Sequence, residues 1–122
     1  MEIEYADETI KELFLDLLNV SGSKNLLQKR IGLPIARQAK MKLNHLMAAD
    51  NFHKYLQYGI GKPHSLTGKF EGYYGVSLSA NFRLIIQPVP DDRSPQALKL
   101  CDTVKIIGIV DYHGEKNEWL IP

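Results

Sequence analysis

The stretch that decides the fold is YGVSLSANFRLII, residues 74–86. Apolar residues occupy every second position on both sides of its Ser79-Ala80-Asn81 segment, from Tyr74 to Leu78 and again from Phe82 to Ile86. Alternation with a period of two is typical of half-buried strands. Small polar residues between two such runs favour a tight turn. The stretch therefore predicts a β-hairpin.

Segments on both sides of the hairpin extend it into an α+β domain. Residues 103–110 form a further apolar run, and residues 1–5 alternate enough for a short strand. Between them, residues 7–18 and 34–47 carry apolar side chains at helical spacing. The order predicts a single domain, residues 1–122, in which two N-terminal helices pack on one face of a small antiparallel β-sheet. The outer face of that sheet is expected to carry the functional site.

Two segments have less definite patterns. Residues 88–95 contain prolines and aspartates, which predict an exposed loop between two strands. Residues 114–122 follow the last apolar run and include Trp119, Leu120 and Ile121. Three alternatives fit this tail: an extra strand, a cover for a sheet edge, or a contact with a partner.

The composition points to an ordinary globular protein. Of the 122 residues, 44% are hydrophobic, and no run approaches the length of a membrane span. We therefore expect a cytoplasmic protein. The net charge is only +1, yet residues 1–23 are acidic and residues 24–58 are basic. The basic segment, with Arg37 and Lys40, is a candidate for contacts with RNA phosphates, although the near-neutral total argues against strong unaided binding of nucleic acid.

Cysteine and metal chemistry are not indicated by this sequence. Cys101 is the only cysteine, so no internal disulfide forms, and nothing beside it would activate the thiol. Asp111 and His113 have metal-ligating side chains, but no third ligand stands at a suitable spacing. His45 and His53 fall in the helical region, where a surface or interface role is favoured. We expect neither a metal nor a cofactor.

Five residues in the second half of the chain match the needs of metal-free RNA cleavage. That reaction requires acid–base groups that titrate near neutrality and a fixed cation for the phosphorane. The candidates are His64 and His113 for proton transfer, Arg83 for the phosphate, Asp111 for orientation and Tyr112 for nucleotide contact. On a strand, residues 111 and 113 face one side and residue 112 the other. A bend at the strand end is needed for all three to line one pocket.

Three motifs in this part of the chain resemble the RelE superfamily of bacterial toxins, and its HigB branch most closely. They are a histidine-led stretch with two glycines (residues 64–76), an asparagine–aromatic–arginine segment (residues 81–85) and the tripeptide Asp111-Tyr112-His113. The match spans roughly residues 60–113. The resemblance implies a RelE-like fold and a type II toxin that cuts mRNA in the ribosomal A site.

The same resemblance implies active-site positions and partners. His64, Arg83 and the tripeptide carry over as active-site residues, while the expected partners are mRNA, the ribosome and a cognate, HigA-like helix-turn-helix antitoxin. Where HigB proteins commonly place a lysine, this chain has Thr67, and Lys69 is the candidate to replace it in RNA binding. Ser79 stands where a further arginine is often found.

Two rival functions remain open at this point. One is a non-nuclease toxin that binds DNA gyrase, as in the ParE branch, although that branch usually lacks the Asp111-Tyr112-His113 ending. The other is a catalytically weakened relative that mainly binds its antitoxin, which is favoured by the two missing cations at Thr67 and Ser79.

Overall fold

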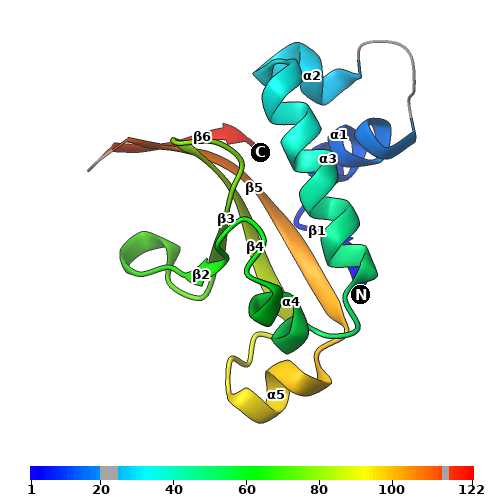
Figure 1. Ribbon diagram of the computed structural model, residues 1–122. Coiled ribbons are helices and arrows are strands. Elements are labelled where there is room, and N and C mark those ends of the chain that lie inside the picture. The colour runs from blue at the N-terminus through cyan, green and yellow to red at the C-terminus, as the bar shows by residue number, and fades with distance from the viewer. Residues whose placement is uncertain (20–24, 114–115) are drawn as a thin grey trace.

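A mixed β-sheet with α-helices on one face makes up the molecule (Figure 1). The computed structural model describes residues 1–19, 25–113 and 116–122. Within these ranges the sheet has six strands in the order β1-β5-β4-β3-β2, and β6 also pairs with β5. The strands are β1 (Glu2–Tyr5), β2 (His64–Ser65), β3 (Tyr74–Ser77), β4 (Phe82–Val89), β5 (Thr103–His113) and β6 (Lys116–Ile121).

The long strand β5 organises the sheet because both of its edges are paired. Along one edge it pairs with β4 in antiparallel register, from Phe82 opposite Asp111 to Val89 opposite Thr103. The other edge is shared by two strands. β1 pairs in parallel with its first part, and β6 pairs in antiparallel fashion with its last part. The tail after residue 115 therefore forms an extra strand, one of the three alternatives considered from the sequence.

The helices and the sheet enclose one main hydrophobic core. Apolar side chains of three helices, α1 (Glu8–Asn19), α3 (Leu33–Ala48) and α4 (Phe52–Tyr58), meet the inward-facing residues of the sheet, such as Leu84 on β4 and Ile106 on β5. None of the helices in the described part of the chain is both long and apolar enough to cross a bilayer. The helices are α1 (Glu8–Asn19), α2 (Leu26–Ile31), α3 (Leu33–Ala48), α4 (Phe52–Tyr58), the short 3-10 helix η1 (Gly68–Phe70) and α5 (Pro95–Leu100).

The other face of the sheet carries a smaller second core. Ile85 of β4 and Val110 of β5 are fully buried there beneath Phe70 of η1 and Leu66. Tyr112 packs against the same cluster, with its ring centroid 6.3 Å from that of Phe70. The outer face is thus partly covered rather than wholly free, because the segment between β2 and β3 folds back over it.

The structure has the fold class predicted from the sequence, but its strands and helices are arranged differently in part. The α+β class and the hairpin of β3 and β4 are confirmed. The expected first strand is present, but the arrangement of two helices on a purely antiparallel sheet is not confirmed. The strand β1 pairs in parallel with β5, and the described part of the chain has further helices. Parallel pairing joins distant segments, and no local pattern reports it.

The two missed helices, α4 and α5, are short and depend on their caps. In α4, the Asn51 side chain accepts a hydrogen bond from the backbone N–H of Lys54, and Gly59 ends the helix with a left-handed backbone. In α5, the Ser94 hydroxyl accepts from the N–H of Ala97, and Pro95 starts the helix. Helices of six or seven residues are too short for a clear periodic pattern. The loop expected over residues 88–95 is present at residues 90–94, whereas Pro88 and Val89 belong to β4 and Pro95 begins α5.

Candidate functional site

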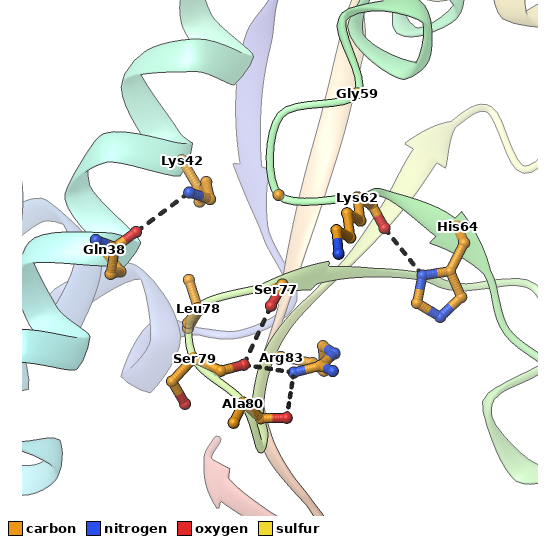
Figure 2. A pocket seen from close by; sticks show the side chains of 11 residues that line it. Gln38, Lys42, Gly59, Lys62, His64, Ser77, Leu78, Ser79, Ala80 and Arg83 are labelled. Carbon is orange, nitrogen blue, oxygen red and sulfur yellow. Dashed lines mark hydrogen bonds between the residues drawn. The ribbon is translucent and has the colours of Figure 1, made fainter.

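A surface cavity of about 760 Å³ opens between α3, the Gly59–Lys62 turn, β2 and the β3–β4 hairpin (Figure 2). Its walls come from segments far apart in the sequence, which the sheet and α3 hold together. The residues that line it are Gln38, Lys42, Gly59, Gly61, Lys62, His64, Ser77, Leu78, Ser79, Ala80 and Arg83.

The charge of this cavity has one sign. Lys42, Lys62 and Arg83 line it together with His64, and none of its lining residues is acidic. Three cations in a concave surface attract anions, and the low-dielectric walls strengthen that attraction. The arrangement suits a phosphate group, which Arg and Lys side chains recognise by charge and by hydrogen bonding.

His64 enters the cavity from the short strand β2 with a defined ring orientation. Its Nδ1 lies 3.0 Å from the carbonyl oxygen of Lys62 (Figure 2). A carbonyl oxygen only accepts, so this hydrogen bond requires the proton on Nδ1. In the neutral ring, Nε2 then carries the lone pair. The exposed His64 side chain can therefore take a proton from a ligand through Nε2.

Arg83 is held by the turn of its own hairpin. Its Nη1 donates to the carbonyl oxygens of Ser79 at 2.8 Å and Ala80 at 3.3 Å (Figure 2). The same atom lies 3.0 Å from the carbonyl oxygen of Phe82, a third acceptor. A guanidinium has five N–H donors. The bonds through Nη1 orient the half-buried group and leave the Nε and Nη2 donors for an anion. Arg83 is thus a pre-positioned cation at the cavity wall.

Lys42 and Lys62 are cavity residues that the sequence reasoning missed. Lys42 projects from α3, and its Nζ donates to the side-chain oxygen of Gln38 at 3.2 Å. Residues four apart lie on the same face of a helix. The spacing of Gln38 and Lys42 was therefore the signal in the sequence that the two side chains lie together. The aliphatic stem of Lys42 packs against Gly61, and the backbone N–H of Ser77 donates to the Gly61 carbonyl at 2.7 Å. This contact ties the turn to both α3 and β3.

Adding a methyl group at Gly61 should destabilise the cavity wall. In Gly61→Ala, the new Cβ would lie 2.7 Å from Cγ1 of buried Val76 and 2.8 Å from Cε of Lys42, at a backbone φ of +76°. Because Val76 cannot yield easily, we expect the free energy of unfolding to fall by about 2–3 kcal/mol, measured by urea denaturation.

The control for this variant is Gly59→Ala. Gly59 also has a positive φ, +68°, but a Cβ there meets nothing within 4 Å. It should lose only about 1 kcal/mol, the backbone cost of the left-handed conformation. Equal losses in the two variants would refute the contact between Gly61 and its neighbours as the source of the difference.

Asp111 and Tyr112 are not among the residues that line this cavity. The backbone of β5 stays paired with β6 as far as His113, which lies opposite Lys116. Tyr112 belongs to the second core, and half-buried Asp111 follows the strand alternation to the opposite face. The side chain of His113 lies outside what the structure describes. Of the four candidate residues whose side chains are described, the cavity unites His64 and Arg83.

The other candidate residues lie apart from the cavity. Lys69 donates to the carbonyl oxygen of Asn117 at 3.2 Å and sits 5.2 Å from the ring centre of Phe70. Arg37 and Lys40 are on α3 but do not line the cavity. Cys101 is buried, as expected for an inert thiol. Within residues 1–19, 25–113 and 116–122, no three His, Cys, Asp or Glu side chains gather as a metal site would require.

Comparisons with known proteins show similarity at the level of structure. No family model matches the chain, and no curated protein sequence matches it. A chain of the YoeB-YefM complex from Staphylococcus aureus has a TM-score of 0.50 and 18% identity, covering 93% of this chain and 97% of that chain. The YoeB/ParE toxin from Agrobacterium tumefaciens follows at 0.47 and 15%, covering 93% and 99%. A heterotetrameric YoeB-YefM toxin-antitoxin complex from Staphylococcus aureus gives 0.47 and 19%, covering 93% and 97%. At these identities the likeness concerns fold alone: the chain has the fold of the matched chain in the first complex.

Proposed function

We propose that this protein is the toxin of a type II toxin–antitoxin pair and a metal-independent endoribonuclease that cuts mRNA on the ribosome. The observation that carries the proposal is the cavity in which His64 and Arg83 meet two lysines without an acidic residue. The sequence motifs shared with the HigB branch point to the same two residues, and the fold of the chain is compatible with that superfamily.

The proposed reaction uses the 2′-hydroxyl of the RNA as its nucleophile. His64 Nε2 removes the hydroxyl proton, and the 2′-oxygen attacks the adjacent phosphorus. Arg83 stabilises the extra negative charge of the phosphorane. The bond from phosphorus to the 5′-oxygen then breaks, and that oxygen takes a proton from a general acid. The products are a 2′,3′-cyclic phosphate and a 5′-hydroxyl, so no water is consumed in the cleavage step.

His113 is our candidate for the general acid, with Asp111 and Tyr112 as supporting residues. The backbone of β4 links the two parts of the site, because Arg83 lies opposite Val110 and Phe82 opposite Asp111. The end of β5 is therefore a direct neighbour of the strand that carries Arg83. In this proposal Asp111 orients an imidazole, and Tyr112 positions a nucleotide through its hydroxyl.

The proposed partners are the ribosome and an antitoxin in the cytoplasm. A chain of the same fold was solved in the YoeB-YefM complex, which supports a proteinaceous partner for this chain as well. The HigB-like motifs favour a helix-turn-helix antitoxin of the HigA type. Arg37, Lys40 and Lys69 are exposed or half-buried lysine and arginine side chains that we assign to contacts with RNA phosphates outside the cavity.

Cleavage in a reconstituted translation reaction tests the proposed function. We expect the wild-type protein to produce RNA ends within codons, only when ribosomes are present. We expect His64→Asn and His113→Ala each to slow cleavage by roughly 10²–10⁴-fold, the usual contribution of one acid–base group. Intact message beside halted growth in cells would point instead to a binding toxin, and a gyrase supercoiling assay would follow. Intact message and normal growth would leave a weakened, antitoxin-binding relative.

A further inference from the structure

Lys42 is a largely buried residue whose ammonium group borders the cavity, and no carboxylate among the described residues pairs with it. The residue is 7% exposed. The acceptor for its Nζ is the neutral side-chain oxygen of Gln38, at 3.2 Å. Among the described residues, the ion pair is between Lys54 and Asp50, so it does not involve Lys42. An ammonium group that faces a cavity with only a neutral acceptor attracts an anion, so an anion from solution would complete this site.

The position of Lys42 places this charge at the cavity wall opposite β2. In Figure 2, Lys42 and Gln38 border the cavity from α3, whereas His64 borders it from β2. Lys62 stands in the turn between them and holds the His64 ring through its carbonyl oxygen. The cations thus form two groups: Arg83 beside His64, and Lys42 on the α3 side, with Lys62 able to serve both.

The size of the cavity indicates more than a single small ion. A volume of about 760 Å³ falls within the range of roughly 300–1,000 Å³ that is typical of sites for nucleotide-sized ligands. Serine hydroxyls and the Gly59 and Gly61 backbone complete a polar lining. A ligand with two separated negative groups and a nucleoside between them fits both the volume and the two groups of cations.

We propose that Lys42, assisted by Lys62, binds a second phosphate of the RNA strand, next to the phosphate held by Arg83 and His64. The identity of the strand as RNA rests on the proposed function. The phosphate site itself rests on the Lys42 ammonium group, which has only a neutral acceptor, and on a cavity whose lining has no acidic residue. The role of Lys42 is to bind and align the strand, and it takes no part in proton transfer.

Binding of a short 2′-O-methyl RNA tests this site without cleavage, because that RNA lacks the attacking hydroxyl. Lys42→Met removes the charge and keeps an unbranched apolar stem. We expect its Kd to rise about tenfold and the slope of log K against log salt to shrink by about 0.7, the loss of one phosphate contact on a single strand. The control is Lys99→Met, which removes the same charge from an exposed position on α5 and should change Kd less than twofold.

A second variant separates binding from a structural role of Lys42. Gln38→Glu places a carboxylate where the amide oxygen now accepts from Lys42, so it neutralises the ammonium within the protein. We expect the same loss of RNA binding together with a raised melting temperature, since the Lys42 ammonium group gains a counter-charge. Unchanged RNA binding in both Lys42→Met and Gln38→Glu would overturn the proposal.

Inorganic phosphate and the cleavage assay distinguish the remaining outcomes. Phosphate that binds in a Lys42-dependent way while the 2′-O-methyl RNA does not bind would identify a small-anion site and overturn the strand assignment. Lys42-dependent RNA binding by a wild-type protein that cleaves nothing would refute the nuclease and support the phosphate site. Normal cleavage together with RNA binding that does not depend on Lys42 would support the nuclease and overturn the phosphate site.

Discussion

Replacing Arg83 with alanine is expected to slow RNA cleavage by roughly 10²–10³-fold, the usual effect of removing one preorganised donor to a developing anion. The reason is the fixed position of its guanidinium, which three carbonyl oxygens of the hairpin hold through Nη1. The measurement is the rate at which new RNA ends appear in a reconstituted translation reaction. Arg83→Lys keeps the charge but loses the planar fork, so it should recover only part of the rate.

Two controls keep this result specific to the site. Arg93→Ala removes an arginine from the exposed segment before α5 and should cleave at the wild-type rate. Thermal unfolding of Arg83→Ala should show a fold that is retained but weakened by about 1–2 kcal/mol, because bonds to the hairpin carbonyls are lost. A folded Arg83→Ala protein that cleaves within threefold of the wild-type rate would remove Arg83 from the mechanism.

Gly108→Ala should cause the largest loss of stability among single methyl additions considered for this chain. Gly108 lies in β5 next to the irregular pairing with β6, and an added Cβ would clash with the carbonyl oxygen of Ile121 and lie 2.9 Å from Cζ3 of Trp119. The Ile121 contact is with backbone, so β6 must move away as a unit. We expect the free energy of unfolding to fall by about 3 kcal/mol.

Trp119 provides a direct readout for that movement, because it is the only tryptophan in the chain. Its ring packs against Phe70 at a centroid distance of 5.6 Å. Release of β6 should shift its fluorescence emission to longer wavelength before global unfolding. Gly75→Ala is the matched control, since a Cβ there would lie 3.3–3.7 Å from the Leu66 side chain, whose flexible end needs to shift by only a few tenths of an ångström. If both variants unfold alike, the close approach at Gly108 does not govern the docking of β6.

The local patterns of the sequence predicted the hairpin, the main helices and the last long strand. Tyr74, Val76 and Leu84 alternate because one face of the sheet is buried, and this signal is readable along the chain. The parallel pairing of β1 with β5 and the pairing of β6 with β5 could not be predicted from such local patterns. The first depends on a strand about 100 residues away. The second joins neighbouring strands, but it requires that Gly108 has no side chain.

The residues of the candidate site could likewise be predicted only in part from the sequence. His64 and Arg83 were found because their chemistry and their motifs stand out. Lys40, and not Lys42, was predicted to contact RNA phosphates, because both are lysines on one basic helix. The packing of α3 against Gly61 is what distinguishes them. The separation of Tyr112 from the cavity likewise follows from the second core, which forms when η1 folds over the sheet.

The parallel pairing of β1 with β5 has a consequence for the order of assembly during synthesis. Glu2 pairs with Thr103 and Tyr5 with Ile106, so β1 leaves the ribosome long before its partner strand emerges. The β3–β4 hairpin, by contrast, is local and closes early. Until β5 has left the exit tunnel, the apolar face of α1 has no sheet to cover and remains available to chaperones. The sheet therefore closes only after β5 has emerged.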